Sequence, residues 1–144
     1  MTIYGGGWFY DRKGKYSRKE IYNELMTKEI FFTDYTDDYT TKNAQNVLNL
    51  LKQAKAGDII YLKTYHIKKK FVEIQAIGRF DDKGFVDKTI GGQNGTARSV
   101  NWVKKILSNP SFIEIPSPTE HNTTFYEENN AKIIEEIMKR LNEK

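Results

Sequence analysis

Hydrophobic residues recur at helical spacing in three parts of the chain. The first part follows Ser17, and Ser17 with Glu20 fits a capping box, so a helix is predicted from there to about Thr27. The second begins near Thr41 or Lys42, and the third begins after Asn129 or Asn130, where an asparagine can cap the first turn. The apolar positions that define the three helix faces are Ile21, Leu25, Val47, Leu48, Leu51, Ala54, Ile133, Ile134, Ile137 and Leu141.

Other segments show the alternating or continuous apolar patterns of β-strands. Residues 59–65 and 71–80 flank the basic turn Lys68-Lys69-Lys70, which predicts a hairpin. Residues 81–84 (DDKG) predict a turn, and the Gly/Asn-rich stretch 86–97 predicts a flexible loop. Further strands are predicted at 2–10, which holds three glycines, at 99–103 and at 111–115. The order of elements predicts one α+β domain, residues 1–144, whose sheet curls into a barrel.

Composition removes several classes of function. The 144 residues contain no cysteine, which excludes a disulfide framework, a cysteine zinc site and a thiol nucleophile. Only His66 and His121 could supply imidazole, so a histidine metal site is not expected. There is no membrane-length apolar run and no signal-peptide pattern, so we expect a cytoplasmic protein without a membrane partner. The net charge of +4 allows a polyanionic partner.

One pair of carboxylates offers catalytic chemistry. Asp58, followed by Glu73 on the next predicted strand, loosely resembles the acidic pair of a restriction-type nuclease, which holds a metal and orients water. The position where such a site usually has lysine is Gln75, and Asp58 also suits an ordinary turn before a strand. Phosphate-binding loops and a nucleophile elbow are absent from the sequence. A nuclease therefore remains an alternative, and no catalytic residue is assigned.

Aromatic and basic residues offer a binding surface instead. Three glycines in a strand lose packing and cost conformational entropy, and a flat ligand against bare backbone beside Trp8 would compensate. Lys63 continues an apolar strand and is followed by Thr64, and both side chains are typical phosphate ligands. Trp102 suits either a pocket wall or the core. The remaining candidate phosphate contacts are Lys68, Lys69, Lys70 and Arg98.

Four elements in order resemble the EVE-type branch of the PUA-like superfamily. They are Tyr4-Gly5-Gly6-Gly7-Trp8, Lys55 to Lys63 (KAGDIIYLK), Ile74 to Gly78 (IQAIG) and Val100-Asn101-Trp102, with Thr124-Phe125-Tyr126 as a possible closing strand. The set is most similar to the N-terminal domains of McrB-type modification-dependent restriction GTPases. The chain departs from that pattern because Ala56 replaces the usual proline and Thr64 replaces serine. We also expect it to be the reader alone, without a GTPase or nuclease of its own.

The resemblance implies a PUA/EVE-like curled β-barrel of five to six strands flanked by three helices. It also implies a reader that flips a modified base into an aromatic pocket and acts without its own catalytic residues, cofactor or metal. The partner is then nucleic acid, DNA rather than RNA, with separately encoded GTPase or nuclease effectors. The implied base pocket comprises Gly6, Gly7, Trp8, Tyr35, Lys63, Thr64 and Trp102.

The energetics of base recognition fit such a reader. Flipping a base costs a few kcal/mol, and stacking on an aromatic side chain returns about 1–3 kcal/mol. Two classes of alternative stay open. One is an enzyme, either a small metal-dependent nuclease using Asp58 and Glu73 or an ASCH-type RNase. The other is a domain that binds a small ligand or a protein in the same pocket.

Overall fold

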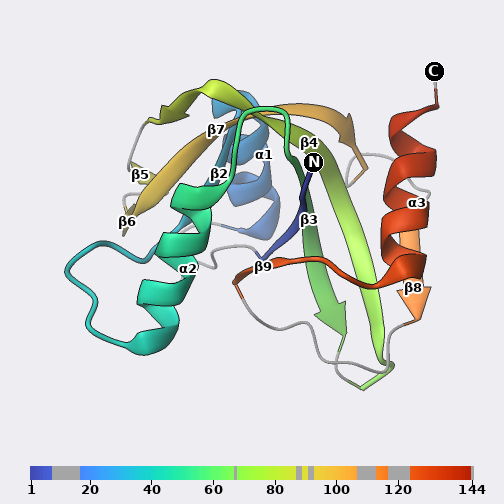
Figure 1. The fold of residues 1–144 in the computed structure, drawn as a ribbon, viewed down its shortest axis with the longest axis horizontal. Coiled ribbons are helices and arrows are strands. Elements are labelled where there is room, and N and C mark those ends of the chain that lie inside the picture. The colour runs from blue at the N-terminus through green and yellow to red at the C-terminus, as the bar shows by residue number, and fades with distance from the viewer. Residues whose placement is uncertain are drawn as a thin grey trace.

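The computed structural model describes residues 1–7, 17–66, 68–86, 89–90, 93–106, 113–116 and 124–143. Within these ranges the chain is an α+β domain in which helices pack on a strongly curled, half-barrel sheet (Figure 1). The helices are α1 (Arg18–Lys28), α2 (Lys42–Gln53) and α3 (Ala131–Leu141). The strands are β1 (Ile3–Gly7), β2 (Ile30–Thr33), β3 (Ile59–His66), β4 (Phe71–Phe85), β5 (Thr89–Ile90), β6 (Gln93–Asn94), β7 (Thr96–Lys105), β8 (Ile113–Pro116) and β9 (Phe125–Glu127).

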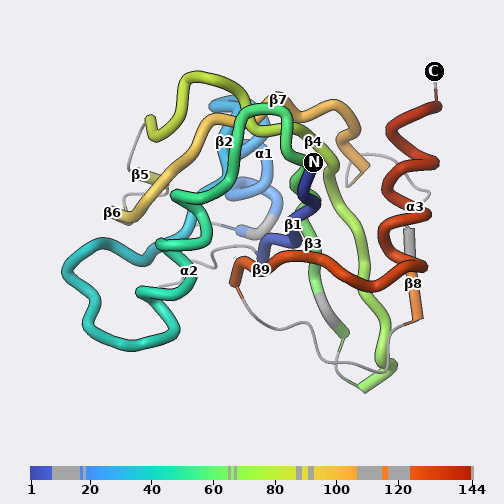
Figure 2. The backbone as a smooth tube through the Cα atoms, viewed as in Figure 1, coloured from blue at the N-terminus to red at the C-terminus, as the bar shows by residue number. Residues whose placement is uncertain are grey.

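The main sheet has the strand order β2-β7-β4-β3-β1-β9, and β8 also pairs with β4. Adjacent strands of this sheet run antiparallel, except β1 and β3. These two run parallel, with Ile3 opposite Ile59 and Gly7 opposite Lys63. A parallel pair needs a crossover, and here α1, β2 and α2 make it. Figure 2 shows that β9, close to the end of the chain, returns to lie beside β1 at the start of the chain. A strand is therefore present at the predicted place, and it forms one edge of the sheet.

The predicted helix starts are confirmed by their capping contacts. Ser17 Oγ accepts a hydrogen bond from the Glu20 N–H, and Glu20 Oε1 accepts one from the Ser17 N–H, which completes the capping box. Thr41 caps α2 in the same way through the Ala44 N–H. Asn130 caps α3 by accepting from the backbone of Lys132 and Ile133. These local bonds satisfy donors that would otherwise lack partners at a helix start.

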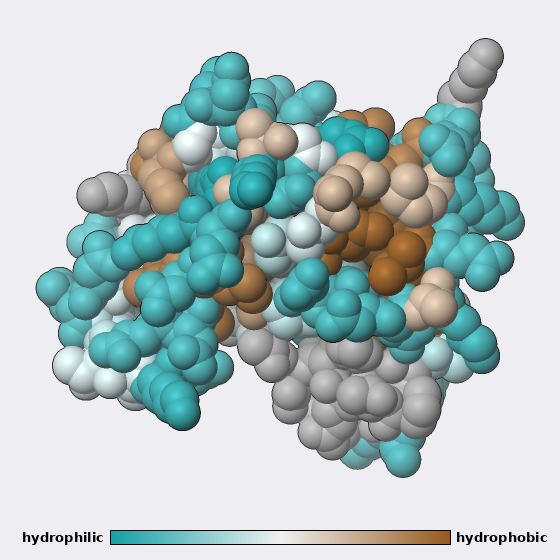
Figure 3. Space-filling model, in the orientation of Figure 1, coloured by the Kyte–Doolittle hydropathy of each residue, from teal (hydrophilic) through white to brown (hydrophobic). Residues whose placement is uncertain are grey.

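The two faces of the sheet carry two hydrophobic cores because side chains alternate along a strand. Ile60 and Leu62 of β3 enter the core that also holds the buried faces of α1 and α2. Ile59 and Tyr61 enter the core on the other face, which Ile133 and Ile137 of α3 cover. Apolar side chains remain visible at the surface where α3 meets the sheet (Figure 3). The C-terminal helix therefore packs on its own sheet, as its stripe predicts.

The segment after residue 80 differs from its prediction. Asp81 to Gly84 do not end the strand, because β4 continues to Phe85 and resumes its pairing with β7 at Phe85 and Arg98 after an irregularity. Asp81 accepts a hydrogen bond from the Ser99 hydroxyl at 2.6 Å, and Gly84 has a positive φ of 69°, which lets the strand bend. The predicted loop 86–97 contains the short β5–β6 hairpin, which buries Ile90. Tertiary pairing thus overrides the local turn signals.

Within the described ranges, every helix falls short of the length and apolar character that crossing a membrane requires.

Candidate functional site

Lys63 lies within β3, opposite Gly7, the last residue of β1, and we call this part of the sheet the Lys63 end. Its residue surface is only 4% exposed, and its ammonium nitrogen lies 5.2 Å from the centre of the Tyr126 ring. Burial lowers the pKa of Lys63 to about 8, while the nearby Glu128 carboxylate acts in the opposite direction. The predicted cation is therefore a buried group held over an aromatic ring.

Beside Lys63, two tyrosines and a carboxylate form a buried polar cluster, which we call the Tyr61–Tyr126–Glu128 cluster. The two phenol oxygens are 2.7 Å apart, and Tyr61 donates a hydrogen bond to Glu128. Burial raises the pKa of both phenols, so both hydroxyls stay protonated at neutral pH. The second oxygen of Glu128 accepts from the backbone N–H groups of Asn129 and Asn130, which fixes the carboxylate at the entry to α3.

Gly5 and Gly6 leave space for side chains of the protein itself. A β-carbon at Gly5 would lie 2.5 Å from the Tyr126 ring and 2.8 Å from the Tyr61 hydroxyl. A β-carbon at Gly6 would lie 2.5 Å from the ring of Phe31. This differs from the expectation of a planar guest over the glycine strand, because aromatic rings already occupy the space at these two positions. Trp8, the indole expected to cover that guest, lies outside the described residues.

Thr64 points away from Lys63, because neighbours on a strand face opposite sides of a sheet. Its hydroxyl donates to Gln75 Oε1 at 3.2 Å, and Gln75 Nε2 donates to Glu73 at 3.3 Å. His66 Nε2 lies 3.0 Å from the same Glu73 oxygen, and the His66 ring stacks on Phe71. Lys63 and Thr64 thus belong to separate polar clusters on the two faces of β3.

Trp102 and Arg98 lie inside the first core. The indole N–H of Trp102 donates to the Ile30 carbonyl at 3.2 Å, and the residue is 6% exposed. Arg98 is 7% exposed, donates to the Leu51 carbonyl at 2.6 Å and lies 4.8 Å from the centre of the Phe80 ring. Of the two roles left open for Trp102, the structure places it in the core. Arg98 differs from the predicted phosphate contact, because a phosphate contact requires an exposed side chain and α2 covers this one.

The lysines of the β3–β4 turn are exposed, as their predicted role as phosphate contacts requires. Lys68, Lys69 and Lys70 are all exposed at the tip of the hairpin, and Lys70 adopts a positive φ of 54°.

The same hairpin separates the two candidate nuclease carboxylates. Asp58 precedes β3 and accepts from the backbone N–H groups of Thr2 and Lys55, whereas Glu73 pairs with Thr64 near the other end, roughly 20 Å away along the strand. These two carboxylates are not placed to share one metal ion.

Tyr35 lies apart from Lys63, in the loop between β2 and α2. Its hydroxyl accepts from Asn43 Nδ2, and its ring lies against Tyr39 with 5.4 Å between centres. Its carbonyl accepts from the hydroxyl of Thr96 in β7 at 2.7 Å. The structure therefore brings Tyr35 to the start of β7 rather than to the Gly7–Lys63 end of the sheet.

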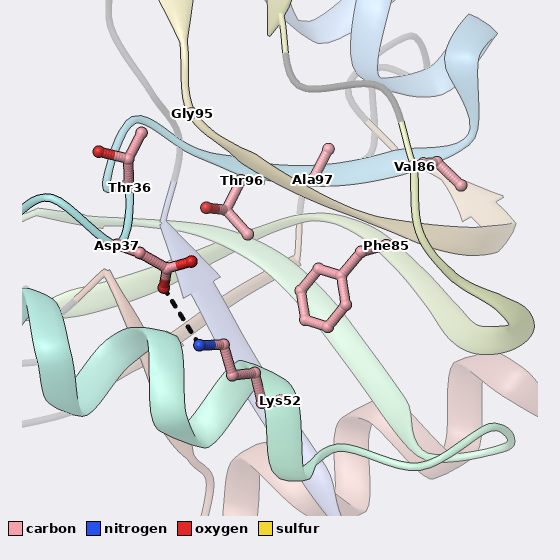
Figure 4. A pocket seen from close by; sticks show the side chains of 8 residues that line it. All are labelled: Thr36, Asp37, Lys52, Phe85, Val86, Gly95, Thr96 and Ala97. Carbon is pink, nitrogen blue, oxygen red and sulfur yellow. Dashed lines mark hydrogen bonds and ion pairs between the residues drawn. The ribbon is translucent and has the colours of Figure 1, made fainter.

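A pocket of about 270 Å³ opens beside this loop (Figure 4). The Phe85 ring projects into it from the end of β4, and Lys52 of α2 and Asp37 of the loop form an ion pair at 3.1 Å. Sequence reasoning missed these three residues, because they are polar or lie in a predicted turn and only the fold brings them together. The one local signal was an aromatic residue directly after Gly84. The complete lining is Thr36, Asp37, Lys52, Phe85, Val86, Gly95, Thr96 and Ala97.

Among the described residues, His, Asp and Glu side chains nowhere gather in a group of three that could hold a metal ion. Comparison of the sequence with family models and with curated proteins gives no match to either.

Proposed function

We propose that this chain is a PUA/EVE-like nucleic-acid reader that binds a polyanionic backbone at the exposed lysines of its β3–β4 turn and receives a modified, flipped base nearby. Its partner on this proposal is DNA rather than RNA, and separately encoded GTPase or nuclease effectors act on what it binds. The curled α+β sheet with flanking helices is compatible with such a domain. The likeness of the four sequence elements adds the base-reading role.

One observation carries the proposal. The β1–β3 register places Gly7 beside Lys63, and β3 continues from Lys63 into the exposed lysines 68–70. The exposed cationic turn is therefore the part of this hairpin that a phosphate backbone can reach, and the buried Lys63 adds positive charge behind it. Exposed lysines are usual ligands of nucleic-acid phosphates, which supports a backbone contact at this turn.

The test measures binding of methylated and unmethylated DNA and RNA oligonucleotides by fluorescence anisotropy across a range of salt. The K68Q/K69Q/K70Q variant should bind more weakly at low salt. Its slope of log K against log salt should also fall by about 2–3, since each phosphate contact contributes about 0.7–0.9. Trp8→Ala should weaken binding at all salt concentrations and reduce any preference for a methylated base, because stacking does not depend on counterions.

A second triple variant is the matched control. K19Q/K132Q/K139Q removes the same charge from exposed lysines of α1 and α3. It should leave the salt slope close to that of the wild type. The proposal fails if no oligonucleotide binds, or if the two triple variants lose the same affinity and the same slope.

A further inference from the structure

The pocket beside α2 is separate from the Lys63 end of the sheet and is not used by the proposed function. Its walls come from the loop before α2, from α2 itself, from the end of β4 and from the start of β7. At about 270 Å³ it is slightly smaller than the roughly 300–1,000 Å³ typical of pockets for drug-sized ligands. A guest of one ring system is the size that fits.

Phe85 gives the pocket a flat apolar surface. Its residue surface is 45% exposed, which is unusual for phenylalanine, and Figure 4 shows its ring beside Lys52 and Thr96. The buried Arg98 guanidinium lies 5.7 Å from the centre of the Phe85 ring and holds it from within. The ring is thus supported by the core and open to the pocket, as a stacking surface requires.

A hydrogen-bond acceptor and a hydrogen-bond donor lie across the pocket from this ring. The Asp37 carboxylate accepts hydrogen bonds, and the Lys52 ammonium 3.1 Å away donates them. Thr96 Oγ1 donates to the Tyr35 carbonyl and so keeps lone pairs that can accept from a ligand. A donor and an acceptor side by side match a ring edge that carries an N–H next to a carbonyl or a ring nitrogen.

From the stacking ring, the paired donor and acceptor and the size, we infer that this pocket binds a nucleobase. The ring of the base lies against Phe85, an N–H of its edge donates to Asp37, and its neighbouring acceptor takes a hydrogen bond from Lys52. The same chemistry has two sources, a free nucleoside or an unpaired base of a single strand. The inference stands on the pocket and does not require the proposed function.

The experiment titrates the full chain with uridine, guanosine, adenosine and cytidine, and separately with a single-stranded octanucleotide, by calorimetry and by saturation-transfer NMR. Phe85→Ala should weaken binding about 5- to 150-fold, the range for a lost base–aromatic stack. Phe85→Leu keeps an apolar side chain but removes the ring, and it should also weaken binding. Asp37→Asn should weaken binding of uridine. 3-Methyluridine, which lacks the ring N–H, should bind the wild type weakly and respond little to Asp37→Asn.

Val103→Ala is the matched control. Val103 is as exposed as Phe85, but it lies near the end of β7, whereas the pocket is lined by the start of β7. Thermal unfolding verifies that each variant is folded. If nucleosides bind and their binding depends on Phe85 and Asp37, the inference is supported and the ligand is a free nucleoside. If only the octanucleotide binds, with the same dependence, the inference is supported and the ligand is an unpaired base of a single strand. Absence of binding, or binding equal in wild type, Phe85→Leu and Val103→Ala, overturns it. Loss of oligonucleotide binding in K68Q/K69Q/K70Q with nucleoside binding intact separates this site from the proposed backbone contact.

Discussion

Single side chains set the chemistry of the Lys63 end of the sheet. Lys63 is held over the ring of Tyr126, whose hydroxyl meets that of Tyr61, and Tyr61 in turn donates to Glu128. Gly5 permits this arrangement, since any β-carbon there would overlap the two tyrosines. The glycine therefore has a packing reason within the protein. Gly7 is held by the sheet as well, since its N–H donates to the Thr124 carbonyl at 2.7 Å.

The depressed pKa of Lys63 makes stability depend on pH in a defined direction. Its folded value of about 8 lies below the ordinary 10.5, so between these values the unfolded chain binds more protons than the folded one. The free energy of unfolding should therefore rise from pH 8 to pH 10, by up to about 2 kcal/mol. The tyrosines of the cluster have raised pKa values, and they begin to oppose this rise as the pH approaches the ordinary phenol pKa of 10.0, where the unfolded phenols ionise and the folded ones do not. Urea unfolding at pH 7, 8, 9 and 10 measures the effect.

Lys63→Met is the control for that pH dependence, because methionine fills similar space without a charge. The rise between pH 8 and pH 10 should be absent in the variant. An equal rise in both proteins would show that another group causes it.

Helices and strands of this chain form where the local sequence predicts them when the contacts that stabilise them are between near neighbours in the sequence. The start of α1 is an example, since Ser17 and Glu20 bond each other's backbone across three residues. The end of β4 is the opposite example, since residues 81–84 have turn chemistry but lie in an irregularity of β4, which pairs with β7 at Phe80 before them and at Phe85 after them. The pairing on both sides of these residues keeps them within the strand in spite of their local preference.

Removing the cap of α1 should have a modest and local effect. Ser17→Ala deletes the acceptor of the Glu20 N–H and should lower the free energy of unfolding by about 1 kcal/mol. Chemical denaturation measures the change. Glu20→Gln keeps a capping-box side chain and should change stability much less. Equal losses in the two variants would contradict the role assigned to the Ser17 hydroxyl.

At the scale of the whole molecule, one curled sheet separates two cores and two candidate sites. The α1 and α2 core lies on one face and the α3 core on the other, and β3 contributes to both. The cluster beside Lys63 belongs to the α3 side, while the nucleobase pocket opens between α2 and the start of β7. Because the same sheet supports both, α3 should unfold together with the rest of the domain.

Shortening a buried side chain of α3 tests that cooperativity. Ile137 is fully buried, and Ile137→Ala should lower the free energy of unfolding by about 2–5 kcal/mol while unfolding stays a single transition. Ile134→Ala, on the half-buried side of the helix, should have a smaller effect. Circular dichroism and tyrosine fluorescence should give coincident denaturation curves. An early helical transition in Ile137→Ala would show that α3 is released independently.

The sequence by itself determined the three helices with their capping residues, the β3–β4 hairpin and the α+β class, because these depend on contacts between near neighbours and on the period of apolar positions. Only the tertiary structure decided the sites. Tyr61 and Glu128 are 67 residues apart, Trp102 and the Ile30 carbonyl are 72 apart, and Phe85, Lys52 and Asp37 meet from three elements. Burial of Trp102 and Arg98 and the opposite orientations of Lys63 and Thr64 depend on which face of a curled sheet each residue occupies. That choice is made by packing between distant segments and leaves no local pattern in the chain.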